Sequence, residues 1–515
     1  METKPPNPLF ESRGMIVTAV LVTVAVRLYL LWQYYCISSD GIHYIAAAQD
    51  FFAGHVAAGL ASVYPPGYPL LIAAIFPLVG EWELAGQILS LFFAVLLLWP
   101  LYRLFREVYD ARVAGIACIL AGLSPFLARY SVHVRTESPF LFFSTLALLL
   151  FYQGMQTRRL GRFLWGGLVA GFGYLIRPEA LGFLVIVPAF LGFFWLLKKE
   201  PDGLWRIKSA AVWCAAFMLF ALPFITYLSI ETGRWGAMSR KAGMTLAISL
   251  QQYGLLEADD GQDVPSVESV EFLDFVRHHP IRYLRKVAMG FFPAIGVFFE
   301  ALHFSYVPFL LAGLYFVFRD KVWQRKDCLI LWFVCFYLFA FLLILVKRRY
   351  SLQVVPVSLG WVAIGVLWAW DYLRASLPIR SARLVFVLII LAFLGGTLPK
   401  TLTPISREKG YVRETGRYLK ERNRSEKLNV AVWDDRITFY AQANTLFLAG
   451  IEESRLAGRL REQRADYLAV ESKAWQKFYP GIASQPEAYG LALEREFVGY
   501  RRDRMLLFKV KVAME

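Results

Sequence analysis

The chain has 515 residues, of which 57% are apolar and 16% are aromatic, and it carries a net charge of +15. In a soluble protein this charge would suggest a nucleic-acid partner. Here most of the Lys and Arg residues lie in short stretches between long apolar runs, where such residues set membrane orientation and contact anionic headgroups. The composition therefore excludes a soluble nucleic-acid-binding protein and indicates a polytopic membrane protein. The five cysteines show no metal-ligand or redox spacing, so we interpret them as small core residues.

The polar N-terminus is followed by an apolar run from Met15 to Ile37. A secretory signal peptide is the alternative, but no small-residue cleavage site follows the run, so we predict that it is the first span. Apolar runs of about 20 residues match the bilayer core, and the lack of water there makes each of them a helix. The predicted spans, eleven in all, are 15–37, 86–105, 113–129, 138–154, 163–177, 180–197, 209–230, 304–318, 328–346, 351–370 and 384–399.

The orientation follows from the basic loops. With a cytoplasmic N-terminus, five loops are cytoplasmic and all five are basic, as the positive-inside rule requires. These loops are 103–112, 158–162, 198–208, 319–326 and 374–383. Two further apolar stretches, Tyr68–Val79 and Val287–Phe299, are predicted to lie at the membrane interface as amphipathic or re-entrant helices.

This topology leaves two large outer loops, 38–85 and 231–286, and an outer C-terminal region. That last region alternates charged helical segments with short β-like runs such as LNVAVW, DYLAVE and RMLLFKV, the pattern of a small α/β unit. We therefore predict two domains, a transmembrane domain over 1–404 and an extracytoplasmic α/β domain over 405–515.

The first outer loop begins with SSDGIHY directly after the first span. On a helix that starts at Ser39, the side chains of Asp40, His43 and Tyr44 share one face. Such a face could take part in chemistry at the membrane surface. The alternative is structural, with Asp40 and Ser39 capping an interfacial helix.

The second motif is HVRTESPF at 133–140, which sits at the outer mouth between two spans. His133, Arg135 and Glu137 together could bind a phosphate and position a hydroxyl group. A capping box that involves Thr136 and Glu137, with the next helix beginning at Ser138, is the alternative.

Two further outer turns carry charge. Arg177 and Glu179 occupy the short connection in LIRPEALGF, where they could also simply pair and reach water. Lys347, Arg348 and Arg349 stand together at the outer end of another span, against the positive-inside bias.

The predicted topology brings Asp40, Glu137, Arg177 and Arg349 to the same outer membrane surface. A carboxylate can act as general base on an acceptor hydroxyl or amine. Arginine and lysine can stabilise the negative charge of a departing phosphate. The combination suits transfer from a membrane-embedded phosphate ester.

These motifs resemble those of the GT-C superfamily of membrane glycosyltransferases, in the branch of the protein O-mannosyltransferases and the bacterial aminoarabinose transferases. The resemblance runs over nearly the whole chain. It rests on the acid Asp40, YPPGYP at 64–69, TESPF at 136–140, RPE at 177–179 and RRYSLQVVP at 348–356.

The resemblance implies a GT-C fold and an inverting transfer of a sugar from a polyprenyl-phosphate donor. It implies that Asp40 is the catalytic acidic residue, that Glu137 occupies the second acidic position, and that the loop 231–286 is a mobile cover over the site. Arg177 and the segment 348–350 are implied for the lipid phosphate. The full set of predicted substrate-binding residues is His43, Tyr44, Tyr64, His133, Arg135, Arg177, Glu179, Lys347, Arg348, Arg349 and Tyr350.

The chain departs from its relatives in two places. Many of them have a second acid directly after the first-loop Asp, where this chain has Gly41. The aminoarabinose transferases have a Lys before the Pro pair, where this chain has Tyr64. These departures bear on the metal arrangement and on phosphate binding.

We interpret the chain as a glycosyltransferase of a bacterial inner membrane, with its active site outside the cytoplasm. Its partners are then membrane lipid, a polyprenyl-phosphate-linked sugar donor and a lipid, glycan or protein acceptor, without nucleic acid. A divalent metal is compatible with this interpretation, but the sequence does not require one. The alternatives are a flippase or transporter of lipid-linked glycans and a surface-glycan polymerase or ligase. A transporter should show charges or broken helices near the bilayer midplane and often an internal repeat. Arg27 is the clearest charge inside a span, and no repeat is evident.

Overall fold

The structure is a computed structural model that describes residues 8–198, 202–255, 272–319, 325–423 and 427–511. The chain separates into two compact units. The first unit comprises the described residues of Met1–Leu31, Tyr44–Glu257 and Val267–Thr403, and the second those of Trp32–His43 and Pro404–Glu515. The short segment Trp32–His43 thus groups with the C-terminal region, although the sequence analysis assigned it to the transmembrane domain.

The first unit is helical. Its helices are α1 (Pro8–Trp32), α2 (Ser39–Phe52), α3 (Val56–Leu60), α4 (Gly67–Val79), α5 (Trp82–Leu96), α6 (Leu98–Val108), α7 (Ala111–Leu123), α8 (Pro125–Tyr130), α9 (Glu137–Thr157), α10 (Leu160–Ile176), α11 (Phe183–Lys198), α12 (Gly203–Thr232), α13 (Lys241–Gln252), α14 (Phe272–His278), α15 (Pro280–Leu302), α16 (Val307–Arg319), α17 (Arg325–Ile344), α18 (Arg348–Ser351), α19 (Val355–Ser376) and α20 (Ile379–Thr401). Three short 3₁₀ turns, η1 (Pro178–Gly182), η2 (Phe304–Tyr306) and η3 (Leu352–Val354), connect some of them.

Among the described residues, seven helical segments are long and apolar enough to cross a membrane. They are Gly14–Trp32, Trp82–Val108, Glu137–Thr157, Gly203–Thr232, Asp327–Ile344, Arg348–Ser376 and Ile379–Thr401. The pair α15 and α16 also passes as one span, although the two helices meet at 89°. Three further predicted spans coincide with the shorter apolar helices α7, α10 and α11. The membrane-protein class is confirmed, whereas the count of eleven spans stays a prediction.

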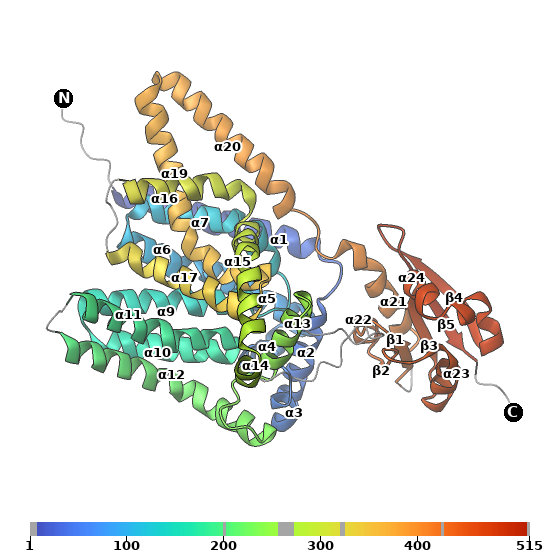
Figure 1. The fold of residues 1–515 in the computed structure, drawn as a ribbon. Coiled ribbons are helices and arrows are strands. Elements are labelled where there is room, and N and C mark those ends of the chain that lie inside the picture. Colours follow the sequence, from blue (N-terminus) through green and yellow to red (C-terminus); the bar gives the residue numbers. More distant parts are fainter. Residues whose placement is uncertain (1–7, 199–201, 256–271, 320–324, 424–426, 512–515) are drawn as a thin grey trace. The chain divides into compact units, whose positions relative to one another are not determined.

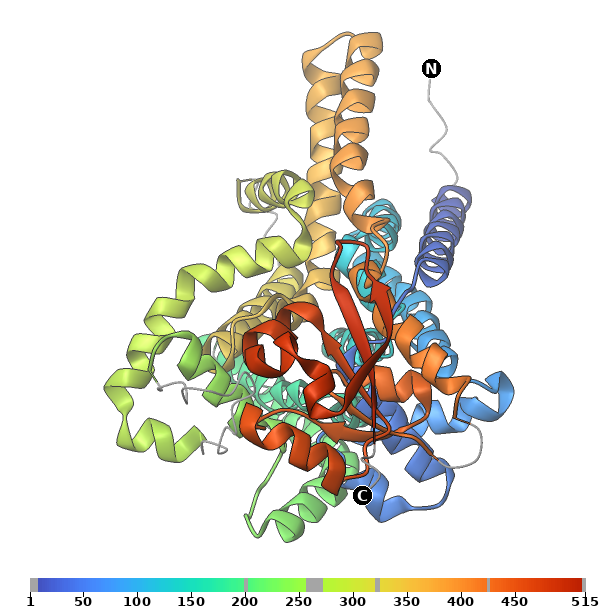
Figure 2. The same ribbon diagram turned by 90° about the vertical axis from the view of Figure 1, so that its right-hand side faces the viewer.

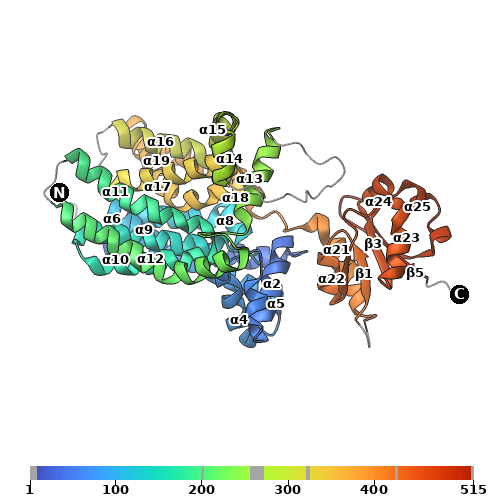
Figure 3. The ribbon, with the colours of Figure 1, turned by 60° about the horizontal axis from the view of Figure 1, so that its bottom comes forward.

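The helices of the first unit pack closely against one another along their lengths. Helices α9, α10, α11 and α12 lie side by side (Figures 1 and 3), and α10 contacts both α9 and α12 along its length. Helices α16 and α19 approach so closely at Gly313 and Gly365 that a Cβ atom on either glycine would lie 1.9 Å from a carbonyl oxygen of the other helix. Such close approach is how membrane helices gain packing without a hydrophobic driving force. Helices α19 and α20 form a hairpin whose connecting end extends beyond the other helices (Figures 1 and 2), whereas the start of α19 and the end of α20 contact α7, α8 and α16.

The second unit contains a five-stranded sheet with the order β2-β1-β3-β5-β4. Strand β1 (Asn429–Val432) pairs in parallel with β2 (Asn444–Phe447) and β3 (Tyr467–Glu471). Strand β5 (Arg504–Val510) runs antiparallel to β3 and to β4 (Leu491–Val498). The helices of this unit are α21 (Gly410–Lys420), α22 (Arg436–Ala441), α23 (Glu453–Glu462), α24 (Ser472–Phe478) and α25 (Pro480–Ser484), with 3₁₀ turns η4 (Arg407–Lys409) and η5 (Pro486–Tyr489).

Each face of the sheet carries its own apolar core. Helices α21 and α22 cover one face, and α23, α24 and α25 cover the other (Figure 3). Alternate strand residues supply the two cores, so that Val430 and Val432 face α21 and α22 whereas Ala431 faces α23. This is the period of two that a sheet covered on both sides requires.

The predicted α/β character of the C-terminal region is confirmed. The runs LNVAVW, DYLAVE and RMLLFKV contain β1, β3 and β5. The charged segments VRETGRYLKERN and EESRLAGRLREQR, which were predicted to be helical, correspond to α21 and α23. The sequence analysis missed β2 and β4. Both are edge strands with mixed burial, so neither has the continuous apolar run that reveals a buried strand.

Candidate active site

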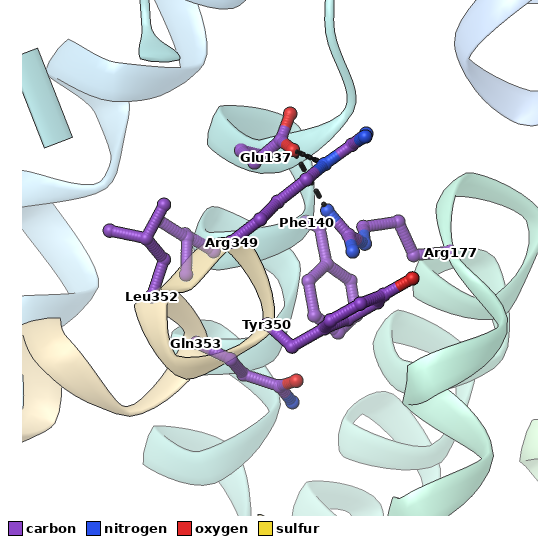
Figure 4. A pocket seen from close by; sticks show the side chains of 8 residues that line it. Glu137, Phe140, Arg177, Arg349, Tyr350, Leu352 and Gln353 are labelled. Carbon is purple, nitrogen blue, oxygen red and sulfur yellow. Dashed lines mark hydrogen bonds and ion pairs between the residues drawn. The ribbon is translucent and has the colours of Figure 1, made fainter. Parts of the chain in front are cut away.

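Glu137 is the first residue of α9 and one of the most deeply buried charges of the first unit, with 2% of its surface exposed. Thr136 precedes the helix, but its side chain makes no capping hydrogen bond, and the helix begins at Glu137 rather than at Ser138. The capping-box alternative is therefore wrong. Instead, Glu137 Oε1 accepts from Arg349 Nε and lies 3.2 Å from Arg177 Nη1 (Figure 4).

Arg177 links two carboxylates. It follows α10 with an extended backbone and precedes Pro178, which ends the helical run. Its Nη2 lies 2.5 Å from Glu179 Oε1, and its guanidinium group is 5.6 Å from the ring centre of Phe140 and 5.7 Å from that of Tyr350. The side chain is only 9% exposed. Arg177 therefore does not reach out to water, as the alternative interpretation of this turn assumed.

Arg349 reaches Glu137 because α17 ends nearby. Lys286 of α15 is fully buried, and its Nζ donates to the carbonyl oxygens of Leu342, Leu343 and Ile344 at 2.9, 2.7 and 3.0 Å. A cation at the last carbonyls of a helix complements its negative end. The chain then runs extended through Lys347 and starts the short helix α18 at Arg348.

The three consecutive cations that the sequence analysis noted have three different environments. Lys347 is exposed. Arg348 pairs with Glu300 at a site where both side chains are more than a third exposed, and it lies 4.2 Å from the ring centre of Phe126. Arg349 alone of the three joins Glu137.

A small cavity of about 10 Å³ lies beside the ion pairs. Its lining residues are Glu137, Phe140, Leu141, Arg177, Arg349, Tyr350, Leu352 and Gln353. In the described structure, two buried polar atoms of this lining, Glu137 Oε2 and Gln353 Nε2, have no hydrogen-bond partner. Thr245 of α13 lies close to Tyr350 at the edge of the cavity. Part of the loop 231–286 is thus near the site, whereas residues 256–271 of that predicted cover lie outside the described residues.

The turn before Glu137 adds further charge. Arg135 lies within electrostatic reach of Glu137, and its guanidinium group is 5.5 Å from the ring centre of Tyr130. Burial, together with Arg135 and Arg129, lowers the pKa of His133 to about 3. His133 is therefore neutral near pH 7 and does not contribute a positive charge.

Three tyrosines pack beneath this turn. Tyr44 is buried, with ring centroids 4.3 Å from Tyr64 and 5.2 Å from Tyr68. Its hydroxyl lies 3.5 Å from Thr136 Oγ1, and the Tyr68 hydroxyl lies 2.8 Å from Ser90 Oγ. Tyr44 thus contacts the turn through Thr136, and Tyr64 packs against Tyr44. Tyr68 belongs to the same group of tyrosines, but the sequence analysis did not select it.

Gly67 explains the YPPGYP run in physical terms. A Cβ atom at this position would lie 2.7 Å from the carbonyl oxygen of Leu175, at the end of α10. The start of α4 therefore packs directly against the main chain that leads into Arg177. Only a residue without a side chain permits this approach.

Asp40 lies in the second unit, in the first turn of α2. The amide of Gly41 donates to Ser38 Oγ at 3.2 Å, so Ser38 caps this helix rather than the predicted pair of Ser39 and Asp40. A Cβ atom on Gly41 would lie 2.9 Å from Cγ1 of Ile37. A side chain at the position after Asp40 would therefore require the side chain of Ile37 to shift.

His43, one turn further along α2, faces the second unit as well. Burial raises the pKa of Asp435, and the nearby His43 opposes that rise. Asp435 follows β1 and was not among the predicted site residues.

The described residues do not form a metal site. Within the described ranges, no three His, Cys, Asp or Glu side chains gather closely enough to hold a metal ion. The donor set at the Glu137 cluster consists of two carboxylates held by arginines, which does not fit a divalent cation.

The buried ion pair of Glu137 and Arg349 should couple more strongly than its exposed neighbour. We expect the substitutions Glu137→Gln and Arg349→Gln, made singly and together, to give a coupling free energy of about 2 kcal/mol. Glu300→Gln and Arg348→Gln form the control cycle, with an expected coupling of about 0.5 kcal/mol. Thermal unfolding in detergent gives the coupling free energy of both pairs. Equal values would contradict the stronger coupling expected for the buried pair of Glu137 and Arg349.

Comparisons with known proteins agree with this geometry. Residues 63–230 match the family model of the dolichyl-phosphate-mannose-protein mannosyltransferases. An uncharacterised protein of Aquifex aeolicus is 30% identical over 125 residues, which is 24% of each chain.

Two solved structures share the fold over nearly the whole chain. An oligosaccharyltransferase of Archaeoglobus fulgidus, solved with a tethered acceptor peptide, matches with a TM-score of 0.63 and 15% identity over 98% of this chain and 74% of that one. ArnT of Cupriavidus metallidurans, solved with undecaprenyl phosphate, matches with a TM-score of 0.58 and 13% identity over 97% of this chain and 98% of that one. The chain therefore has the fold of these two proteins, and residues 63–230 resemble the dolichyl-phosphate-mannose-protein mannosyltransferases.

Proposed function

We propose that the chain transfers a sugar from a polyprenyl-phosphate donor to a lipid, glycan or protein acceptor outside the cytoplasm, with inversion at the anomeric carbon. The observation that carries this proposal is the buried cluster at the start of α9. There, the three cations Arg135, Arg177 and Arg349 surround the two carboxylates Glu137 and Glu179. An excess of positive charge at the end of a membrane helix suits a lipid phosphate.

The roles of the residues follow from the reaction. An acceptor oxygen or nitrogen attacks the anomeric carbon, and the bond between that carbon and the phosphate oxygen breaks. The departing polyprenyl phosphate gains negative charge, which Arg177 and Arg349 would stabilise. Glu137 would hold both guanidinium groups in place before the donor arrives, so that they need not reorganise during the reaction.

We assign the general base to Asp40 on the strength of the sequence resemblance. It would take the proton from the acceptor as the new bond forms. The ArnT structure with undecaprenyl phosphate supports a lipid-phosphate donor by analogy of fold.

Of the features that a transporter should show, the charge of Arg27 has a structural explanation, whereas the 89° bend between α15 and α16 is compatible with that alternative. Arg27 is 2% exposed, and its Nη1 donates to the carbonyl oxygens of Thr23 and Gly122 at 3.3 and 3.0 Å. Main-chain carbonyls thus bind this charge inside the helix bundle. Cations inside a membrane are commonly bound in this way.

The orientation of the chain is testable with a reporter. If the C-terminal domain lies outside the cytoplasm, a cytoplasm-dependent fluorescent protein fused after Glu515 should stay dark in cells. A truncated fusion after Arg383, in a predicted cytoplasmic loop, should fluoresce. Strong fluorescence from the first fusion would mean that the domain lies in the cytoplasm.

Donor binding should depend on Arg349 more than on its neighbour. Arg349→Gln removes a cation from the buried cluster, and we expect the KM for the polyprenyl-phosphate sugar to rise about tenfold or more. Arg348→Gln is the matched control, since its partner Glu300 is partly exposed, and we expect a change of less than about threefold. Steady-state transfer in detergent with matched protein amounts gives both values. Equal KM values for the two variants would place the donor phosphate elsewhere.

Asp40→Asn should abolish most of the transfer without unfolding the protein. The change removes the charge but keeps the shape, and loss of a general base lowers the rate by about a hundredfold or more. Asp50→Asn changes the same residue type near the other end of α2 and should leave the rate unchanged. The rates of sugar transfer by the two variants and the parent are compared in membranes with matched expression. Activity of Asp40→Asn within a few-fold of the parent would rule out the catalytic role and leave Glu137 as the next acid to test.

A further inference from the structure

The segment that leads into Asp40 is built into the C-terminal domain. Tyr35 N donates to the carbonyl oxygen of Ile405 at 3.0 Å, and Ile405 N donates to that of Gln33 at 2.9 Å. These bonds form a short parallel bridge between the segment after α1 and the start of the C-terminal domain. The side chain of Cys36 is fully buried in the apolar core that α21 and α22 form on the sheet.

Side chains of the C-terminal domain bind the main chain of the same segment. Ile37 N donates to the Tyr440 hydroxyl at 2.8 Å, and Arg413 Nη1 donates to the carbonyl oxygen of Tyr34 at 3.2 Å. Arg436 Nη1 lies 3.5 Å from the carbonyl oxygen of Ile37.

Arg436 is itself fixed in place. Asp434 binds it with both carboxylate oxygens, at 2.7 Å from Nε and 2.5 Å from Nη2. Such a fork contact defines the orientation of a guanidinium group. The side chain that faces the carbonyl oxygen of Ile37 is therefore already held in its orientation by Asp434.

Asp40 follows this anchored segment directly, and the main chain between Ile37 and Asp40 is closely packed. Ile37 packs over Gly41, and Ser38 caps the first turn of α2. The turn that carries Asp40 thus directly follows main chain that the C-terminal domain binds.

We propose that the C-terminal domain positions Asp40, with Tyr440 and the Asp434–Arg436 pair as positioning residues. The catalytic role of Asp40 in this statement rests on the proposed function. A misplacement of about 1 Å at a catalytic group can lower a rate by about a hundredfold. Loosening one anchor should therefore reduce kcat while leaving donor binding intact.

The test uses Tyr440→Phe in the full-length protein. This change removes only the hydroxyl group that accepts from Ile37 N. We expect kcat for sugar transfer to fall about tenfold, while the donor KM and the melting temperature stay close to those of the parent. Tyr418→Phe is the matched control, because it removes a hydroxyl group of the same domain that donates to Glu494 and not to the segment.

A second readout does not need sugar transfer. Cys36 is buried only while the segment stays packed on the C-terminal domain, so its alkylation rate, measured by mass spectrometry of its peptide, reports detachment. We expect alkylation of Cys36 and hydrogen exchange in the peptide around Asp40 to rise several-fold in Tyr440→Phe and not in Tyr418→Phe. The double variant Asp434→Asn, Arg436→Gln should behave like Tyr440→Phe.

The outcomes separate the two proposals. Parental kcat and parental Cys36 protection in both anchor variants would overturn the positioning role. A raised donor KM with unchanged kcat, or a reduced kcat with unchanged protection of the segment, would overturn it as well. If the parent transfers no sugar, the proposed function fails, and the alkylation and exchange rates alone decide whether the domain holds the Asp40 turn.

Discussion

Burial of the Glu137 carboxylate determines which helix ends of the first unit must lie together. A charge taken out of water at the end of a membrane helix is unfavourable by several kcal/mol unless opposite charges and hydrogen bonds replace the lost hydration. Arg177 and Arg349 provide this compensation from two other parts of the chain. The ends of α9, α10 and α17 must therefore meet at one place, and that meeting place is the candidate active site.

The same constraint explains why the neighbouring main chain is so closely defined. Arg349 arrives at Glu137 only if α17 stops at Ile344, and the buried amine of Lys286 stabilises that stop by binding three carbonyl oxygens. Arg177 arrives only if α10 ends beside α4, where Gly67 permits the close approach. Two residues without any contact to Glu137 thus determine whether its partners are in reach. A cluster assembled in this way is preorganised, which is the property that electrostatic catalysis requires.

Sequence patterns revealed the charged residues of the site but not how they pair. Glu137, Arg177 and Arg349 each interrupt or end an apolar run, and a charge in such a place is visible without a structure. That Arg349 rather than Arg348 reaches Glu137 depends on the turn at α18, which no pattern specifies. Lys286 stands in the basic run HHPIRYLRK and looks like an interfacial cation, because its carbonyl partners lie more than fifty residues away. The place of Cys36 in the C-terminal core was equally hidden, since the contact joins segments about 400 residues apart.

That long separation has a consequence for how the protein becomes active. Residues 32–43 leave the ribosome early, but the core into which Cys36 packs includes Tyr411, Ile437 and Leu507 from the last part of the chain. Contacts between such distant segments form late, because the loop that joins them must close first. The ion pairs of Glu137 involve no residue of the C-terminal domain, so the cluster around Glu137 can assemble before synthesis ends. The turn that carries Asp40 cannot reach its final support until the whole chain is made. If Asp40 is the base, a chain that is still being synthesised could bind a lipid phosphate but would lack the fixed carboxylate needed to use it.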